Sequence, residues 1–174
     1  MDRKNTIIIV LVAVLAVAVG VAAFLNSGNL TEKRKMQQEA KVVLKDRDGE
    51  IETIGLGYIT GLHPVEFSAT LDTSNSGPRE QLYTGIELKK IFSSLGIDSR
   101  DYSTVLVKAV DGYTVALTME EVLKESNIYL AYQMNGESLG TKEEGGSGPY
   151  QLIVREDQFS QRWCKFVTEV ILEE

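Results

Sequence analysis

The sequence predicts an α+β domain, mainly β, that follows an N-terminal transmembrane helix. Two observations predict the domain: short segments that alternate apolar and polar residues recur after residue 41, and turn signals such as Asp-Gly and Asn-Gly separate them. Only two or three segments have helical spacing, so strands dominate. A third observation, an unbroken apolar run near the start of the chain, predicts the membrane helix.

The apolar run extends from Ile7 to Leu25. At ~1.5 Å per residue, a helix of this length spans the ~30 Å hydrocarbon core of a bilayer. A cleavable signal peptide is the alternative, but its apolar centre usually has only about 7–15 residues, so the length favours an uncleaved anchor. Arg3 and Lys4 favour a cytoplasmic amino terminus, which predicts a single-pass membrane protein with its body outside the cytoplasm. The basic residues 33–35 on the other side of the run weaken this charge difference.

The chain divides into three predicted parts. Residues 1–25 form the anchor, residues 26–41 form a polar stalk, and residues 42–174 form the globular domain. The formal net charge of the chain is −7, from 18 Lys and Arg against 25 Asp and Glu. Nucleic-acid binding depends on Lys and Arg that neutralise phosphates, so this acidic chain argues against a nucleic-acid partner. We interpret the acidity as a contribution to solubility.

The first segments of the globular domain predict a hairpin and then a single strand. Residues 41–45 and 50–54 are strand-like and flank an Asp-Gly turn. Residues 55–61 contain too many glycines for a stable helix, which predicts a loop or a short turn. Residues 65–71 alternate apolar and polar side chains and predict a half-buried strand, whereas the composition of residues 72–81 predicts a surface loop.

The second half of the domain combines further strands with two short helices. Residues 86–95 have helical spacing, with Gly96 as the cap. Thr118 and Glu121 form a capping box, which predicts a short helix that ends at Lys124. The predicted strands are residues 105–109, 114–117, 128–134, 151–154 and 165–172, and residues 141–149 are a predicted loop.

Five short motifs follow one another across about residues 42–174. They are Tyr-Thr-Gly-Ile-Glu-Leu (83–88), Asp-Gly-Tyr (111–113), Leu-Ala-Tyr with Asn-Gly-Glu-Ser-Leu (130–139), Gly-Pro-Tyr-Gln-Leu-Ile-Val (148–154) and Lys-Phe-Val (165–167). Together and in this order, they resemble the motifs of the sulfite-oxidase-type molybdopterin-binding domain family. The resemblance implies the sulfite-oxidase-like molybdopterin-binding fold, and it also implies an oxidoreductase with a molybdopterin cofactor.

The chain departs from that family at the residues that would carry the chemistry. Enzymes of the family hold molybdenum with a cysteine thiolate upstream of the first motif, and residues 71–81 of this chain contain no cysteine. Gln151 stands where the family has arginine, and Arg155 stands where a proline usually ends the strand. The resemblance therefore implies the scaffold, while we expect no cofactor; molybdopterin is implied by the resemblance alone.

Isolated residues with reactive side chains do not form a recognisable site. Cys164 is the single cysteine, which excludes an internal disulfide and a Cys-rich metal site. We interpret it as a buried apolar side chain, with an intermolecular disulfide as the alternative. His63, the single histidine, has no neighbour at metal-ligand spacing, so we interpret it as a turn residue before Pro64. Residues 143–148 lack the Lys-Ser/Thr of a phosphate loop and predict a flexible loop.

These observations favour a non-catalytic binding module that is tethered to a membrane and binds a small molecule or a partner protein. A molybdopterin-dependent oxidoreductase with atypical ligation and a subunit of a membrane redox complex are the alternatives. Neither a catalytic residue nor a metal ligand is predicted. The candidate ligand-binding residues are Tyr83, Asp111, Tyr113, Tyr132, Asn135, Gly148 and Gln151.

Overall fold

The computed structural model describes residue 9 and residues 11–21, 35–73 and 76–174, and the chain divides into two compact units, Met1–Lys35 and Met36–Glu174. In the first unit, residue 9 and residues 11–21 are helical. None of the helices formed by the described residues is long and apolar enough to cross a membrane. The predicted bounds of the membrane helix, Ile7 and Leu25, lie outside the described residues, and so do residues 26–34 of the predicted stalk.

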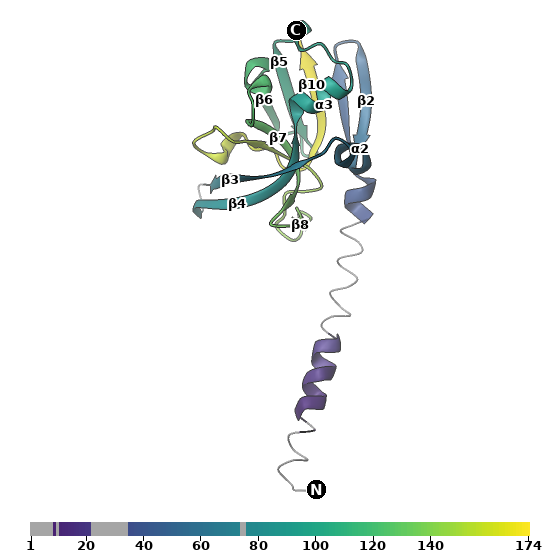
Figure 1. Ribbon diagram of the computed structural model, residues 1–174, viewed down its shortest axis with the longest axis vertical. Helices are drawn as coiled ribbons and strands as arrows, with labels where there is room; N and C mark the ends of the chain where they lie inside the picture. Colours follow the sequence, from purple (N-terminus) through teal and green to yellow (C-terminus); the bar gives the residue numbers. More distant parts are fainter. Residues whose placement is uncertain (1–8, 10, 22–34, 74–75) are drawn as a thin grey trace. The chain divides into compact units, whose positions relative to one another are not determined.

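The second unit is a mainly β body with two five-stranded sheets (Figure 1). One sheet has the strand order β2-β1-β10-β5-β6, and the other has the order β3-β4-β7-β8, with β9 paired to β7. The predicted mainly β class with a few short helices is thereby confirmed. The elements are β1 (Lys41–Asp46), β2 (Gly49–Gly55), α2 (Leu56–Gly61), β3 (Val65–Thr73), β4 (Ser76–Glu87), α3 (Leu88–Ser94), η1 (Ser99–Asp101), β5 (Thr104–Ala109), β6 (Thr114–Thr118), α4 (Met119–Leu123), β7 (Ile128–Met134), β8 (Glu137–Ser138), β9 (Gln151–Val154), η2 (Ser160–Arg162) and β10 (Val167–Glu173).

Apolar side chains from both sheets form one core. Val105, Val107 and Ala109 point inward along β5, as their alternation predicts, and Val115 and Leu117 do the same along β6. Strand β7 is buried along most of its length and lies inside its sheet, paired with β4 on one side and with β8 and β9 on the other. The alternation of apolar and polar residues in β5 and β6 therefore predicts correctly which face of each strand packs against the core.

Two helices differ from the prediction. Residues 55–61, predicted as a loop or turn, contain the short helix α2. Its Ile59 is fully buried, and this burial outweighs the helix-destabilising effect of the glycines. Helix α3 begins at Leu88 rather than at Ile86 because Ile86 still belongs to β4, where it pairs with Leu130 of β7.

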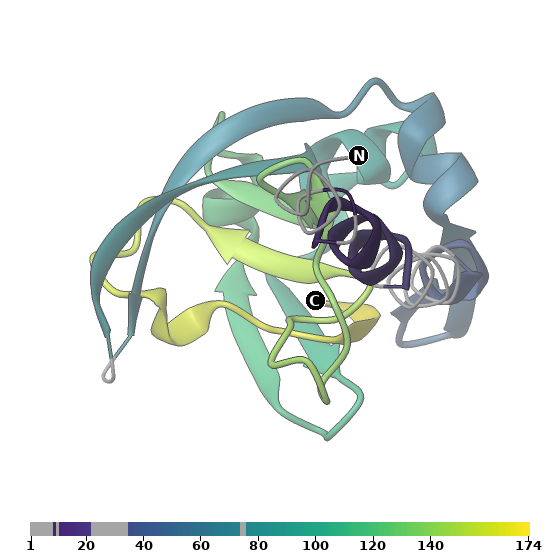
Figure 2. The same cartoon turned by 90° about the horizontal axis from the view of Figure 1, so that it is seen from below.

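Residues 72–73 and 76–81, which fall within the predicted surface loop 72–81, belong instead to a long β-hairpin. Strand β3 continues to Thr73 and β4 begins at Ser76. Backbone pairing, such as that of Thr70 with Glu80, supports this part of the hairpin, while residues 77–80 stay exposed and are therefore mostly polar. Figure 2 shows the β3–β4 hairpin, coloured blue to teal, and the β5–β6 hairpin, coloured teal to green, projecting from the body in different directions.

Residues 36–40 pack on the body, although the sequence places them in the predicted stalk. The Gln37 side chain is 6% exposed, and its Nε2 donates a hydrogen bond to the Tyr132 carbonyl oxygen at 2.6 Å. The Tyr150 hydroxyl donates to the Ala40 carbonyl oxygen at 3.3 Å. These contacts hold the segment before β1 against β7 and against the residue before β9.

Glu87, the last residue of β4, is a buried carboxylate with three polar partners. Its Oε1 accepts a hydrogen bond from the Ser126 amide at 2.6 Å and lies 3.3 Å from Lys89 Nζ, while its Oε2 lies 3.5 Å from Lys90 Nζ. Burial raises the pKa of Glu87, but the Ser126 amide and the two lysines outweigh burial and lower the pKa below its ordinary value of 4.5. The ionised carboxylate therefore ties β4 to the turn before β7.

Replacing Glu87 with glutamine should lower the free energy of unfolding by about 1 kcal/mol at pH 7, because the two lysines lose their counter-charge. The pKa of Glu87 is lower in the folded state than in the unfolded state, so its stabilisation is present above pH 4.5 and is lost as the pH falls through the folded pKa. Urea unfolding from pH 7 to pH 3 should show the difference from wild type shrinking with acidity. Glu66→Gln, at an exposed site on β3, is the control; an equal effect there would contradict the assignment.

Candidate functional site

Two candidate residues, Asp111 and Tyr113, lie on the β5–β6 turn against residues 161–166. The Tyr113 amide donates to Asp111 Oδ1 at 3.1 Å, and the Tyr113 hydroxyl donates to the Gln161 carbonyl oxygen at 2.8 Å. Burial raises the pKa of the Cys164 thiol to about 12, and the nearby Asp111 carboxylate adds to this effect. The turn therefore packs against the 161–166 segment, in which Gln161 and Lys165 are exposed and Trp163 and Cys164 are buried.

A third candidate, Gly148, packs against Phe166 of the same segment. A Cβ atom at Gly148 would lie 2.3 Å from Phe166 Cδ1 and 2.9 Å from Phe166 Cα, and its φ of +90° is a left-handed conformation that favours glycine. The Phe166 amide donates to the Ser147 carbonyl oxygen at 2.8 Å, and the Phe166 carbonyl oxygen accepts from the Val110 amide at 3.0 Å. The structure thus brings three candidate residues together around this segment.

The other four candidates have their polar atoms inside the body or engaged with neighbours. Tyr83, Tyr132 and Gln151 are buried, so they present little surface to a ligand. Tyr83 meets the 161–166 segment from inside the core, where its ring lies 5.7 Å from that of Trp163. Asn135 is exposed at the β7–β8 turn, but its amide group bonds to β4: Nδ2 donates to the Gln81 side chain, and Oδ1 accepts from the Leu82 amide.

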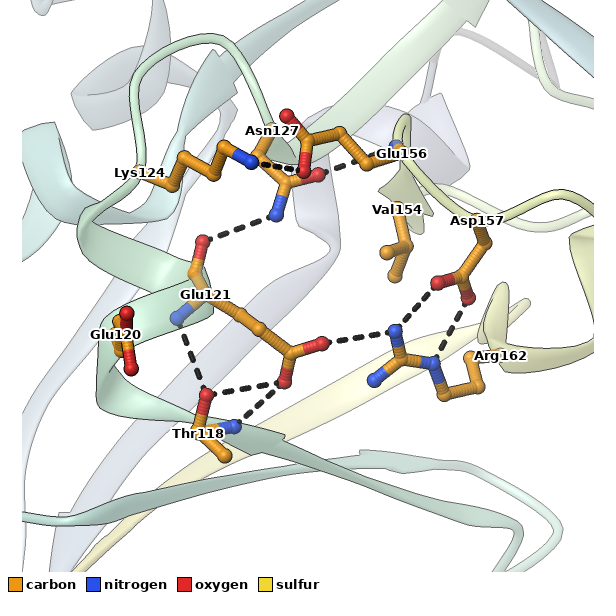
Figure 3. A pocket seen from close by; sticks show the side chains of 9 residues that line it. All are labelled: Thr118, Glu120, Glu121, Lys124, Asn127, Val154, Glu156, Asp157 and Arg162. Carbon is orange, nitrogen blue, oxygen red and sulfur yellow. Dashed lines mark hydrogen bonds and ion pairs between the residues drawn. The ribbon is translucent and has the colours of Figure 1, made fainter.

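A polar pocket of about 330 Å³ lies beside the start of α4 and the end of β9 (Figure 3). Carboxylates outnumber cations among its side chains, so it favours a neutral or cationic occupant over an anion. Figure 3 shows the Arg162 guanidinium between the carboxylates of Glu121 and Asp157. The lining residues are Thr118, Glu120, Glu121, Lys124, Asn127, Val154, Glu156, Asp157 and Arg162.

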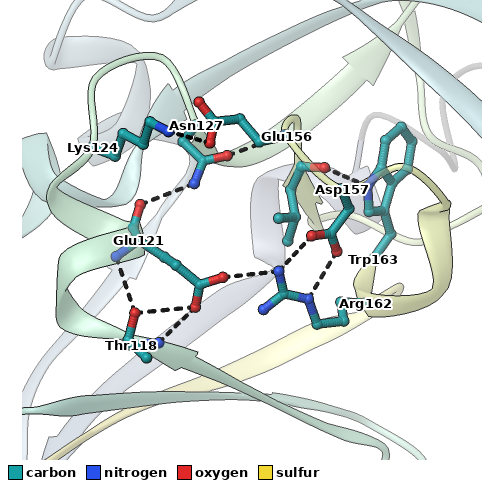
Figure 4. Close-up of polar contacts among 9 residues, drawn as sticks. Thr118, Glu121, Lys124, Asn127, Glu156, Asp157, Arg162 and Trp163 are labelled. Carbon is teal, nitrogen blue, oxygen red and sulfur yellow. Dashed lines mark hydrogen bonds and ion pairs between the residues drawn. The ribbon is translucent and has the colours of Figure 1, made fainter.

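Arg162 organises the wall of this pocket (Figure 4). Its Nε donates to Asp157 Oδ2 at 2.8 Å, and its Nη2 donates to both Asp157 Oδ1 and Glu121 Oε1. These contacts raise the pKa of Arg162, and the pKa of Glu121 is lowered, first of all by Arg162. Asn127 completes the wall: its Nδ2 donates to the Glu121 carbonyl oxygen at 3.1 Å, and its Oδ1 accepts from the Glu156 amide at 3.2 Å.

The sequence reveals only one part of this pocket. The capping box of Thr118 and Glu121 is predicted and confirmed, with the Glu121 amide donating to Thr118 Oγ1 at 3.1 Å. Nothing in the local sequence indicates that the same Glu121 side chain also accepts from Arg162, which lies 41 residues further along the chain. No spacing rule joins Asn127 to Arg162 either, since only the fold places both beside Glu121.

Arg162→Met should lower the free energy of unfolding by about 1–2 kcal/mol, because it leaves the partly buried Asp157 and Glu121 carboxylates without their common donor. Arg162→Lys should recover part of the loss, since lysine keeps the charge but lacks the planar fork. Guanidinium unfolding curves measure both. Arg47→Met breaks an exposed pair with Glu174 and should change little; an equally large effect there would contradict this account.

The described residues do not fit a molybdenum-pterin group held by a thiolate. Cys164 is fully buried, its thiol has a pKa of about 12, and its Sγ contacts the Lys165 carbonyl oxygen at 3.8 Å. Across the part of the chain that the structure describes, no three His, Cys, Asp or Glu side chains are grouped so as to hold a metal. His63 is exposed between α2 and β3 with a φ of 56°, in keeping with its interpretation as a turn residue.

Comparison with known proteins gives a family and a fold. The family model described as oxidoreductase molybdopterin binding domain matches residues 64–174. No curated protein matches the sequence. The crystal structure of the sulfane dehydrogenase SoxCD from Paracoccus pantotrophus is similar, with a TM-score of 0.65 at 15% sequence identity. The match covers 79% of this chain and 39% of that chain, so this chain corresponds to less than half of the SoxCD chain and shares its fold there.

Proposed function

Because this chain belongs to the oxidoreductase molybdopterin-binding domain family, we propose that it uses the family scaffold as a binding module and carries out no molybdenum chemistry. This proposal rests on the burial and the raised pKa of Cys164, which is the single cysteine of the chain. A metal or a substrate reacts with a thiolate, and a thiol with a pKa of about 12 stays protonated at neutral pH. Its burial also removes it from any ligand in solution.

The segment that would supply a sulfur donor in the family has a different role here. Residues 71–81 contain no cysteine, and residues 71–73 and 76–81 belong to β3 and β4. A second candidate, an oxidoreductase with atypical ligation, would need oxygen or nitrogen ligands in place of the thiolate. The cationic side chains of the pocket, Lys124 and Arg162, are already paired with carboxylates, which disfavours the phosphate of a pterin cofactor there.

The proposed module binds through two parts of its surface. The polar pocket is large enough for a small neutral or cationic molecule. The β5–β6 turn, with Asp111, Tyr113 and the adjoining Gly148, is the proposed contact for a partner. Tyr83, Tyr132 and Gln151 support these surfaces from the core, and Asn135 fixes the β7–β8 turn.

We also propose that residues 1–25 anchor the body to a membrane, outside the cytoplasm. The support is the sequence alone: residues 7–25 are continuously apolar, and basic residues precede them. Residues 26–35 would then link the anchor to the body. Flotation of the full chain with phospholipid vesicles, together with its intact mass, tests this part. Loss of residues 1–25 from the mature protein would contradict it.

The accessibility of the thiol tests the binding-module proposal. In the native full-length protein, Cys164 should react with an aromatic disulfide reagent at least about 100-fold more slowly than in guanidinium, since the reagent needs an exposed thiolate. Cys164→Ser should leave ligand and partner binding unchanged. Rapid reaction of the native protein would show a thiol available for ligation and would contradict the proposal.

A further inference from the structure

The edge of strand β3 is closed by side chains. An unpaired edge strand presents free backbone N–H and C=O groups with which another strand can pair, so proteins usually cover or charge such edges. Arg155 Nε donates to the Ser68 carbonyl oxygen at 3.1 Å. The Ser160 hydroxyl donates to the Thr70 carbonyl oxygen at 3.2 Å and accepts from the Asp72 amide at 2.8 Å. These bonds occupy the backbone groups that an added strand would need.

The edges of β2 and β9 are closed in other ways. On β2, the Thr53 amide donates to the carboxylate of Glu52 at 2.9 Å, and the exposed Glu50 and Glu52 place negative charge along the strand. On β9, the Leu152 amide donates to the Cys164 carbonyl oxygen at 2.8 Å, so the 161–166 segment covers that side.

Strand β6 is the last strand of its sheet (Figure 1), and alternate residues of it face away from β5. The Ala109 amide donates to the Tyr113 carbonyl oxygen at 2.8 Å. Because bonded and non-bonded pairs alternate along an antiparallel ladder, the odd-numbered residues of β6 bond to β5. The even-numbered residues therefore direct their backbone N–H and C=O groups toward the edge of the sheet.

This edge is open at two of those residues. The Thr118 amide is already taken, because it donates to Glu121 Oε2 at 2.9 Å. No described residue bonds to the outward amides and carbonyl oxygens of Thr114 and Ala116. The strand also contains no charged residue, and its even-numbered side chains are exposed. Strand β6 therefore lacks both the covering side chains of β3 and the charges of β2.

We propose that β6 accepts an extended segment of a basic partner protein as an additional strand. The inference rests on the proposed function and specifies how its partner binds. The amides and carbonyl oxygens of Thr114 and Ala116 offer four backbone bonds, and such bonds supply the affinity when a peptide adds to a sheet edge. The small Ala116 side chain leaves room for a β-branched or aromatic side chain opposite it.

Charge favours a basic partner over a second copy of this chain. The formal net charge of the chain is −7, and the exposed Asp111 and Glu120 lie just before and just after β6. Antiparallel pairing of two β6 strands about Ala116 would bring Asp111 of one copy close to Glu120 of the other, where like charges repel. Lys108, a cation on the neighbouring strand, already lies 3.9 Å from Glu169. A lysine or arginine of the partner would instead be attracted to the free carboxylates.

The test uses the full-length protein in detergent and a fluorescein-labelled peptide amide, Lys-Thr-Val-Thr-Val-Thr-Lys. Fluorescence anisotropy should show this probe binding at least about tenfold more tightly than the same peptide with glutamate in place of both lysines. Ala116→Pro should weaken binding at least about tenfold, because proline removes the outward amide yet is tolerated in an edge strand. Ala116→Thr, the matched control, keeps the amide and should stay within about twofold of wild type.

Hydrogen exchange locates the bound probe in the wild-type protein. The lysine probe should slow exchange of the Thr114 and Ala116 amides at least about tenfold and leave the Thr53 amide of β2 unchanged. No binding of the probe, equal binding of the two peptides, or unchanged exchange at Thr114 and Ala116 would overturn the inference.

Two further outcomes separate this inference from its alternatives. Self-association of the wild-type chain that Ala116→Pro abolishes would assign the edge to a second copy and overturn the basic partner. Stoichiometric molybdenum in a protein that still binds the lysine probe at β6 would overturn the proposed function and leave the strand addition standing.

Discussion

Replacing Gly85 with alanine should destabilise the body by about 3 kcal/mol or more, enough to unfold a large fraction of the protein under mild denaturing conditions. Gly85 lies in β4, where the ladder to β7 shifts register between Thr84 and Gly85. A Cβ atom there would lie 2.6 Å from the Leu130 carbonyl oxygen and 2.8 Å from Ala131 Cα. Both obstacles are backbone atoms of a buried strand, so neither moves aside without breaking strand pairing.

Gly77→Ala provides the matched control, since Gly77 lies in the same strand. Among the described residues, no atom would lie within 4 Å of its new Cβ. The change in unfolding free energy should therefore stay within about 0.5 kcal/mol. Urea unfolding followed by tryptophan fluorescence measures both variants. Equal stability of the two variants would show that β4 and β7 do not approach as closely as described.

Tyr83→Ala should cost about 3–5 kcal/mol, because the ring is one of the largest fully buried side chains in the core. Its ring stacks with that of Phe67 at a centroid distance of 6.0 Å and meets that of Trp163 edge-to-face at 5.7 Å. Burial raises the pKa of Tyr83 to about 12, so the phenol stays neutral at physiological pH. The residue therefore acts in this account through packing.

Tyr83→Phe separates packing from binding. Phenylalanine preserves the ring contacts, so the unfolding free energy should change by less than about 1 kcal/mol, and ligand or partner binding should be unchanged. Thermal unfolding of the three proteins, with Tyr83→Ala as the large-effect reference, provides the measurement. Loss of binding in Tyr83→Phe without loss of stability would assign a direct ligand contact to the hydroxyl.

Much of the fold could be predicted from local sequence because local chemistry determines those parts. The alternation along β5 follows from a strand with one buried face. The capping box at Thr118 and Glu121 needs only residues three apart, and it is present as predicted. The Asp-Gly turn between β1 and β2 likewise depends on adjacent residues.

The sequence predicts the structure less well where contacts between distant residues determine it. Helix α2 forms because Ile59 is buried by the rest of the body, which no propensity scale contains. Residues 77–80 of β4 have loop-like composition because consecutive side chains on both faces of the strand are exposed. The burial of Gln37 depends on the carbonyl oxygen of Tyr132, which is distant in the chain.

In the candidate site, too, local sequence predicts some contacts and long-range contacts determine the others. Asp111 and Tyr113 belong to one short turn, so their proximity follows from the sequence. Their meeting with Gly148 around residues 161–166 depends on long-range pairing of β10 with β5. Local sequence does not predict the role of Arg162, because one carboxylate partner, Glu121, comes from α4 and the other, Asp157, from the loop after β9. Motif resemblance singled out Tyr83 and Gln151, and both are core residues of the scaffold.

The molybdenum content of the full-length protein, purified from its native host, tests the central claim most directly. Elemental analysis and pterin fluorescence after oxidation are measured on the same sample, with protein quantified by amino-acid analysis. We expect neither molybdenum nor pterin in stoichiometric amount, because the single thiol is buried and protonated. A molybdenum-to-chain ratio near unity, with matching pterin, would contradict this account.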